Sequence, residues 1–512
     1  MSDIKLEPIG VIVGESSPLQ SIVLFDPDYV IKPRVGMYIT TETEEGVILG
    51  IVESIRAGNP LLPGDMADVN DARKMSRFRD LPGKKYLRGL VQWLSLLKAL
   101  EKGEVRAPSL PPIPSSDVYP ASRESLATIF GPEGRKWIRI GRLLSDETVP
   151  FKINADQLAR HLAILAVTGG GKSNTVCILT KRIVEELGGT AVIFDMHGEY
   201  SSMDLPGVIN VQNPQINPVN LTFEELRTLA RLPENAHNQE RILREAWEKV
   251  NEIRLEKKIS AREIMDLLKN TVKSTIEQKN DSTTKGAARG VLNRLDDITY
   301  YYGDILDGFA PTELEEFIVP SKLNVVDLSS VDERAADAVV AHYLRRLLRA
   351  RKEYIRKKGA SGYPVPVIAF IEEAHILVPS NGYTLTKYWA SRIAREGRKF
   401  QLGITLVSQR PKNVDSEVLS QTNNKVILRI VEPTDMSYVQ RSTEQMSDNI
   451  KDLLPGLNPG EAVVVGMMAR LPAIVKVDLC DVKRAGSDVS LSDLWMIHNI
   501  AKNSSRDVSD VM

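Results

Sequence analysis

Residues 161–173 read HLAILAVTGGGKS, and this stretch decides the fold. A short apolar run, typical of a buried strand, breaks into three consecutive glycines and is followed by a helical pattern over residues 172–187. Glycines allow positive φ angles, so the backbone amides can turn toward one point, and the start of a helix adds partial positive charge there. The stretch therefore predicts a phosphate-binding loop between a strand and a helix.

The loop predicts a nucleotide and metal site. We expect Lys172 to reach the β and γ phosphates of ATP and the Ser173 hydroxyl to ligate Mg²⁺. Ala166 stands where the pattern G-x-x-x-x-G-K-[ST] has its first glycine, a position that needs only a small residue. A glycine-rich turn that merely precedes Lys-Ser is the alternative, and the order of strand, glycines, lysine, hydroxyl and helix disfavours it. The residues expected around the nucleotide are Thr168, Gly169, Gly170, Gly171, Lys172, Ser173 and Asn174.

Length and composition predict a soluble protein of about three domains. The chain has 512 residues, of which 42% are hydrophobic and 26% charged, and its formal net charge is -1. This charge excludes a uniformly basic surface, so any contact with nucleic acid must be local. Cys177 and Cys480 are too few for a disulfide framework or a zinc site, and a reducing compartment is the default. Because no signal pattern and no run of about 18 apolar residues occur, we expect a cytoplasmic protein that does not span a membrane.

The part of the chain before the loop predicts a separate domain, residues 1–155, built on a small β-barrel with a helical and loop excursion. Short β-branched runs alternate with turn signals at 9–13, 21–25, 37–41 and 47–55. Residues 87–100 read as a helix. A strand is expected at 137–144, and residues 148–153 could add one more strand to the barrel.

Residues 156–480 predict an α/β core with a parallel sheet, because apolar strands alternate with helical patterns. The expected strands lie at 191–195, 323–328, 365–371, 402–407 and 425–430. Residues 222–317 are strongly helical and are interpreted as an inserted subdomain. The basic run at 345–358 favours a solvated helix face over a nucleic-acid patch. Residues 481–512 form a tail with one amphipathic helix at 491–501.

Two carboxylates, Glu372 and Glu373, come directly after the apolar strand that ends at Ile371. At such a strand end the first carboxylate orients the Mg²⁺ shell, and the second polarises the attacking water. We therefore assign Glu372 to the metal and Glu373 to the base. Glu372 stands where Asp is more usual, and its longer arm favours a water-mediated contact. The alternative, a solvent-facing pair at a helix start, does not fit an apolar run directly before it.

Gln409, Arg398 and His197 are three further polar residues for which the sequence offers a functional and a plainer interpretation. Gln409 follows the strand at 402–407 and suits a γ-phosphate sensor, although an ordinary polar loop start is the alternative. Arg398, with Arg395 as its substitute, suits a finger that acts from a neighbouring subunit, against a plain surface arginine. His197 has no companion with zinc-like spacing and is expected to be structural.

Five motifs together resemble the HerA family, the archaeal member of the HerA/FtsK group of hexameric ATPases. They are T-G-G-G-K-S at 168–173, D-M-H-G-E-Y at 195–200, I-E-E-A-H at 371–375, R-E-G-R-K at 395–399 and S-Q-R-P at 408–411. The resemblance covers essentially the whole chain, and Ala166 and Glu372 are its departures. It implies a RecA-like P-loop core that follows a small N-terminal β-barrel and carries a helical insertion.

The resemblance also implies a function. The expected protein is a homo-hexamer that uses ATP and Mg²⁺, passes double-stranded DNA through its centre, and works with the nuclease NurA on DNA ends. By analogy Arg398 acts across a subunit interface, Gln409 senses the γ-phosphate, and Arg160 is a further nucleotide contact. Alternatives are a conjugation or secretion motor and a nucleotide-gated clamp that recruits a nuclease. The missing membrane segment counts against the first, and Glu373 against the second.

In such a ring, DNA contacts are expected on the loop at 379–389. It follows the metal-bearing strand, carries the turn signal Asn381-Gly382, and exposes Tyr383 and Lys387. One lysine per subunit, repeated around a ring, builds a strong local field toward phosphates. An ordinary surface loop with a solvated lysine is the alternative.

Overall fold

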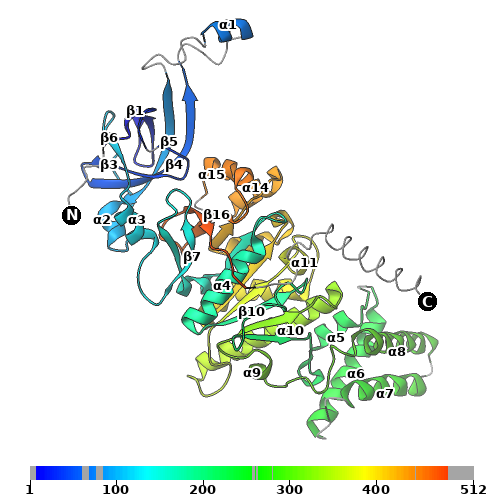
Figure 1. The fold of residues 1–512 in the computed structure, drawn as a ribbon. Coiled ribbons are helices and arrows are strands. Elements are labelled where there is room, and N and C mark those ends of the chain that lie inside the picture. Colours follow the sequence, from blue (N-terminus) through cyan, green and yellow to red (C-terminus); the bar gives the residue numbers. More distant parts are fainter. Residues whose placement is uncertain are drawn as a thin grey trace, which may run out of the picture.

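The structure is a computed structural model, and it describes residues 7–30, 32–59, 68–75, 85–233, 235–256, 260, 263–279, 281–443 and 446–482. A barrel lies at one end of the molecule, a large sheet covered by helices lies in the middle, and a helical insertion lies at the other end (Figure 1). The expected α/β core, the barrel before it and the helical insertion are confirmed. The amphipathic helix expected at 491–501 lies outside the described residues.

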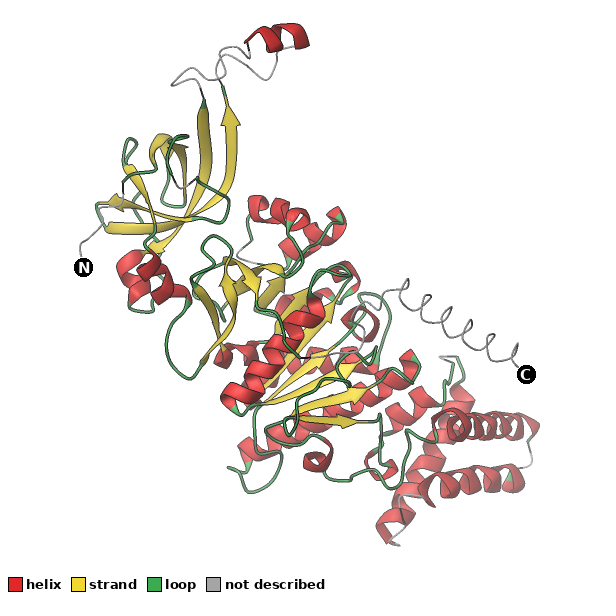
Figure 2. Ribbon diagram, in the orientation of Figure 1, coloured by secondary structure: helices red, strands yellow, loops and turns green. Residues whose placement is uncertain are grey.

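The core is an 11-stranded sheet in the order β11-β12-β10-β13-β14-β9-β15-β16-β17-β7-β8, with parallel pairing from β11 to β15 and antiparallel pairing from there on. Its central strands read as continuous apolar runs because helices cover both faces (Figure 2). The strands are β7 (Trp137–Leu143), β8 (Pro150–Asn154), β9 (Leu162–Leu165), β10 (Thr190–Asp195), β11 (Ile209–Gln212), β12 (Leu323–Asp327), β13 (Val367–Ile371), β14 (Leu402–Ser408), β15 (Asn424–Ile427), β16 (Glu461–Gly466) and β17 (Ala473–Val477).

Successive residues of the central strands point to opposite faces of the sheet, and each face has its own hydrophobic core. In β9, Leu162 and Ile164 pack with the helix that follows the glycine-rich loop, whereas Ala163 and Leu165 pack on the opposite face. The first face carries α4 (Lys172–Leu187), and the second carries α10 (Glu333–Arg356) and α12 (Leu385–Glu396). A strand with both faces buried in this way is held rigidly, and so is the loop at its end.

The barrel closes in the order β1-β2-β5-β4-β3-β6. Its strands are β1 (Gly10–Ser16), β2 (Gln20–Phe25), β3 (Tyr38–Thr43), β4 (Gly46–Gly58), β5 (Tyr86–Leu96) and β6 (Asp117–Pro120). Short helices accompany it: α1 (Val69–Met75), α2 (Leu97–Glu101) and α3 (Arg123–Phe130). Side chains such as Val23, Val52 and Val91 fill the interior.

Two expectations about this region are wrong. The helix expected at 87–100 is the strand β5 for most of its length, with Val91 and Trp93 buried at the two-residue spacing of a strand. Residues 148–153 add no strand to the barrel, because β8 pairs with β7 and both join the core sheet through β17. In each case pairing with strands distant in sequence decides the outcome, and local periodicity does not reveal it.

The insertion consists of α5 (Phe223–Leu229), α6 (His237–Glu256), α7 (Glu263–Gln278), α8 (Ser282–Tyr302) and α9 (Leu314–Phe317). A buried ion cluster joins it to the core: Arg345 of α10 donates from Nε to Glu225 of α5 at 3.0 Å, and His342 Nδ1 lies 3.2 Å from the same carboxylate. Burial raises the pKa of Glu225, but His342 and Arg345 outweigh it and lower the value to about 2.

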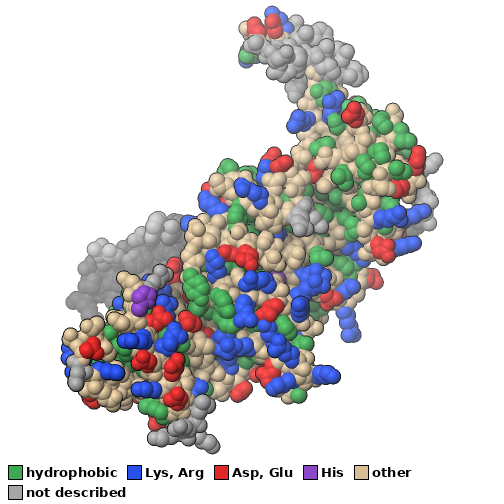
Figure 3. Space-filling view, turned by 180° about the vertical axis from the view of Figure 1, so that it is seen from behind, with side chains coloured by type: hydrophobic (Ala, Val, Ile, Leu, Met, Phe, Trp, Pro, Cys, Tyr) green, Lys and Arg blue, Asp and Glu red, His purple; other side chains and the backbone are tan. Residues whose placement is uncertain are grey.

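The basic run at 345–358 is therefore only partly a solvated face. Arg345 is buried, and Arg351 is fully buried, where it donates to the carbonyls of Tyr363 and Phe400. On the face of Figure 3, Lys and Arg side chains are interspersed with Asp and Glu side chains. Among the helices that the structure describes, none is both long enough and apolar enough to span a membrane.

The remaining short elements lie at the strand ends and in the C-terminal part of the core. They are the helices α11 (Ala374–Leu377), α13 (Ser416–Gln421), α14 (Pro433–Arg441) and α15 (Asp448–Leu453) and the 3-10 helices η2 (Ala155–Arg160), η3 (Pro218–Asn220), η4 (Gly397–Phe400), η5 (Pro411–Asn413) and η6 (Leu454–Gly456).

Candidate nucleotide site

The glycine-rich loop lies at the carboxyl end of β9, and α4 begins at Lys172. Gly169 and Gly171 have φ angles of 74° and 102°, which side-chain-bearing residues rarely adopt. A Cβ at Gly171 would lie 3.0 Å from the backbone nitrogen of Gly460, so this position also needs a glycine for space. Ala166 is fully buried, which explains why a small residue suffices there.

Neighbouring strand ends hold the loop in place. The amide of Val167 donates to the carbonyl of Arg429 at 2.9 Å, and the amide of Gly460 donates to the carbonyl of Gly170 at 3.1 Å. At the tip of the loop, the Thr168 hydroxyl donates to Gln409 Oε1 at 2.7 Å. The structure thus brings Gln409, at the end of β14, to the loop where a sensor of the nucleotide is expected.

Glu373 faces Lys172 across the site. It follows β13 in a left-handed conformation, with φ and ψ both 46°, and is 3% exposed. Its Oε1 accepts from Lys172 Nζ at 3.3 Å and lies 3.2 Å from His197 Nε2. Burial raises the pKa of Glu373, but His375 and Lys172 outweigh it and lower the value to about 2. The carboxylate is therefore ionised and held by cationic or hydrogen-bond-donating neighbours.

Glu372 is buried beside Glu373 in a different environment. Its Oε1 accepts a hydrogen bond from the Tyr200 hydroxyl at 2.6 Å. Burial raises the pKa of Glu372 to about 7, against the opposing effects of Lys172 and Tyr200. Asp195, at the end of β10, orients the turn to Tyr200 by accepting from the Tyr200 amide at 2.8 Å. A desolvated carboxylate of this kind gains most from a nearby cation.

The residues at the loop fit a magnesium nucleotide. Among the residues that the structure describes, none beyond the chain neighbours of Gly169 lies within 4 Å of a Cβ built there, so the tip has room for a ligand. Ser173 and Glu372 offer hydroxyl and carboxylate oxygens, the ligands that Mg²⁺ prefers. Within the described ranges, no group of three or more His, Cys, Asp or Glu could hold a metal alone.

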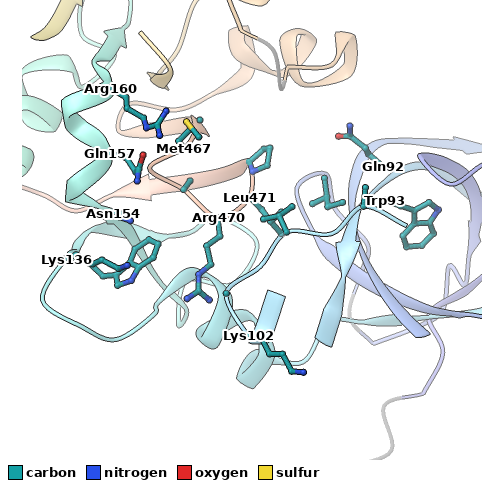
Figure 4. A pocket seen from close by; sticks show the side chains of 18 of the residues that line it. Gln92, Trp93, Lys102, Lys136, Asn154, Gln157, Arg160, Met467, Arg470 and Leu471 are labelled. Carbon is teal, nitrogen blue, oxygen red and sulfur yellow. The ribbon is translucent and has the colours of Figure 1, made fainter. Parts of the chain in front are cut away.

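The two expected arginines lie at the opposite edge of the sheet. Arg398, in η4, precedes β14, and Arg160, in η2, precedes β9, whereas the loop and Gln409 follow these strands. At about 3.3 Å per strand residue, the 7 residues of β14 span about 23 Å and the 4 residues of β9 about 13 Å. Arg398 is exposed. Arg160 lines a crevice of about 900 Å³ between barrel and core, beside Gln157 and Arg470 (Figure 4). Neither side chain belongs to the nucleotide site of its own chain.

The residues expected to contact DNA lie beside α12. Tyr383 is 68% exposed. Lys387, in the first turn of α12, forms an ion pair with Asp415 at 2.9 Å and donates to the carbonyl of Pro379 at 2.9 Å. The charge of Lys387 is thus already compensated within the chain. Arg395, the substitute for Arg398, pairs with Glu417 at 3.3 Å.

A C-terminal strap on α4 is a feature that sequence reasoning missed. Asn174 donates to the carbonyl of Asp478 and accepts from the amide of Cys480, both at 2.8 Å. Cys177 and Cys480 form a disulfide, and Lys181 pairs with Asp481 at 2.6 Å. The Asn174 side chain therefore fastens this strap, residues 478–481, and only the backbone of Asn174 is left for a phosphate contact.

Sequence reasoning also missed the surroundings of Glu373. His375 lies 3.1 Å from its Oε2, and His197, expected to be structural, lies against its Oε1. Tyr200 and His375 both belong to quoted motifs. Membership in these motifs was the only sign in the sequence that the two residues matter. Their roles follow from their distances to Glu372 and Glu373 in the structure.

Comparisons with known proteins show which family the chain resembles. A family model described as the central domain of the helicase HerA matches residues 138–347. The chain is 42% identical to the DNA double-strand break repair helicase HerA of Sulfurisphaera tokodaii over 495 residues, which cover 95% of this chain and 96% of that protein. It is 40% identical to the helicase of the same name from Sulfolobus acidocaldarius, over 98% of this chain and 99% of that protein.

Two solved structures share the fold. VirB4 of Thermoanaerobacter pseudethanolicus superposes with a TM-score of 0.52 at 16% identity, over 68% of this chain and 98% of that one. The bacterial conjugative coupling protein TrwB superposes with a TM-score of 0.50 at 15% identity, over 72% of this chain and 94% of that one. At such identities the likeness concerns the fold alone.

Proposed function

The chain belongs to the HerA helicase family, and on that premise we propose that it is an ATP-driven ring motor that moves along double-stranded DNA in DNA repair. One observation carries the proposal: Lys172, Glu373 and Gln409, from three separate segments, converge on the glycine-rich loop. A site that only binds nucleotide has no need of a buried carboxylate opposite the loop lysine. This counts against the clamp, which would bind ATP without turning it over.

Hydrolysis would begin with an exchange of partners at Lys172. The Lys172 ammonium now contacts Glu373, and it would leave that carboxylate for the β and γ phosphates. Glu373 would then orient the attacking water, and without the neighbouring ammonium its pKa would rise, which makes it a better proton acceptor. Ser173 and Glu372 would hold Mg²⁺, which supplies charge stabilisation at the transferring phosphoryl group. Gln409 would contact the γ-phosphate from the loop tip.

Arg398 and Arg160 support the ring. Both lie at the sheet edge remote from their own loop, so a nucleotide that either one contacts belongs to a neighbouring subunit. An arginine supplied across an interface stabilises the charge of the transition state. We therefore assign Arg398 as the finger in trans and Arg160 as a second contact in trans, in a homo-hexamer.

DNA would pass beside the start of α12. The exposed Tyr383 ring is available to a DNA backbone, and Lys387 would reach a phosphate after exchanging Asp415 for it. Contacts to phosphates give affinity that depends on salt and little on sequence. Processing of DNA ends then requires a partner that cuts, and a NurA-type nuclease is the partner we propose.

Displacement of a third strand from duplex DNA tests the motor directly, together with particle mass in solution. The proposal predicts ATP-dependent displacement by a particle of six subunits, lost in Lys172→Ala. ATP binding with neither strand displacement nor ATP turnover, in the presence or absence of DNA, would instead indicate the clamp.

A further inference from the structure

His375 lies between the two strand ends that carry Glu373 and Gln409. It belongs to α11, the helix that begins immediately after Glu373, and its side chain is 12% exposed. Its Nδ1 lies 3.1 Å from Glu373 Oε2 and 3.4 Å from the Ser408 hydroxyl oxygen at the end of β14. One ring nitrogen thus faces both segments.

The two oxygens of Glu373 differ in how firmly they are held. Oε1 contacts Lys172 and His197, whereas Oε2 is buried and no described group donates a well-aimed hydrogen bond to it. His375 is within ion-pair distance of Oε2, but its nitrogen is directed better toward Ser408. When Lys172 moves to the phosphates, Oε1 loses a partner, and His375, which is mostly shielded from solvent, is placed to hold the carboxylate through Oε2.

Ser408 extends the contact to the nucleotide loop. Its hydroxyl oxygen accepts from the amide of Arg410 at 3.1 Å, which shapes the turn that presents Gln409. Gln409 in turn accepts from Thr168 at the loop tip. The loop tip contacts Gln409, the backbone joins Gln409 to Ser408, and Ser408 contacts His375, which lies beside Glu373.

We propose that His375 is a positioning residue, which turns its Nδ1–H from Ser408 to Glu373 when Lys172 leaves and so sets the carboxylate for its water. The proposal rests on the proposed function, in which Glu373 orients that water. His197 is a weaker candidate because its side chain is 56% exposed and lies on a loop after β10.

The test measures ATP turnover, KM for ATP and thermal unfolding for His375→Ala, His375→Asn and a control, His237→Ala. His237 is exposed at the start of α6 in the insertion. We expect His375→Ala to lower kcat about 10- to 100-fold, with KM and unfolding temperature close to wild type. In His375→Asn the amide nitrogen lies near the position of Nδ1, and turnover should recover to within about threefold of wild type.

A double variant separates positioning from general damage. If His375 acts through Glu373, adding His375→Ala to Glu373→Gln lowers the single-turnover rate no further. Wild-type kcat in His375→Ala would overturn the proposal, as would a full additive loss in the double variant or an Asn variant as slow as Ala. A different result would refute the proposed function itself: the wild type and His237→Ala hydrolyse no ATP, or Lys172→Ala hydrolyses ATP as fast as they do.

Discussion

Replacing Glu373 by Gln should slow turnover and tighten ATP binding at the same time. Loss of the base removes about 10²- to 10⁴-fold in rate, or about 3–5 kcal/mol of barrier. The change in affinity follows from the contact with Lys172, 3.3 Å away, in which the side chains are 14% and 4% exposed. At an effective dielectric constant of about 20 the attraction is about 5 kcal/mol, most of which desolvation offsets. The ion pair then has a net free energy of about 1 kcal/mol, which ATP binding must supply in the wild type to free Lys172. In Glu373→Gln this cost disappears, and ATP should bind about fivefold more tightly.

A fluorescent ATP analogue titrated into wild type, Glu373→Gln and Glu199→Gln measures this effect. Glu199 lies in the loop after β10 and makes no described contact with Lys172, so its variant removes one negative charge near the site and leaves the ion pair intact. We expect tighter binding for Glu373→Gln alone. Equal affinity in all three proteins would refute the reasoning that Lys172 must leave Glu373, and near-normal turnover in Glu373→Gln would refute the assignment of the base.

Three other perturbations test separate parts of the structure. Reductant should lower the urea midpoint of the wild type and leave Cys480→Ser unaffected, because the disulfide spans 303 residues and loop entropy assigns it about 5–6 kcal/mol; equal midpoints in wild type with and without reductant would contradict the pairing. Glu225→Leu leaves the Arg345 guanidinium buried without its carboxylate and should lower the free energy of unfolding by about 3–5 kcal/mol. Because the pKa of Glu225 is lowered to about 2 in the folded state, the ionised carboxylate stabilises the wild type fully above pH 4.5, and this stabilisation is lost as the pH falls toward 2. If the free energy of unfolding of Glu225→Leu fell with pH as steeply as that of the wild type, this reasoning would be contradicted. Subunits carrying Arg398→Ala and Lys172→Ala, each inactive alone, should regain ATPase activity when mixed, and a mixture without activity after confirmed subunit exchange would place Arg398 outside the neighbour's site.

The fold could be predicted wherever a local pattern decides it. Strands such as β10 and β13 are buried on both faces, so their sequences are continuously apolar, and the glycines at 169–171 fix the loop between β9 and α4. The sequence of β5 predicts a helix because its leucines and Trp93 recur at spacings that suit either a helix or a strand. Residues 86–96 form a strand because they pair with β2 on one side and with β4 on the other, and this pairing does not show in the local sequence.

The residues of the site that directly follow a strand could be predicted from the sequence. Parallel strands end at one side of a sheet, and Glu373 and Gln409, which follow β13 and β14, do contact the loop that follows β9. The partner of Glu372 could not be predicted, because Tyr200 lies 172 residues away in sequence. The strap on α4 depends in the same way on a separation of 303 residues.

The rate of ATP hydrolysis with and without linear duplex DNA tests the central claim most directly. The account predicts that duplex DNA accelerates hydrolysis by the wild type and that Lys172→Ala hydrolyses none in either condition. Turnover that duplex DNA leaves unchanged, or that survives in Lys172→Ala, would contradict it.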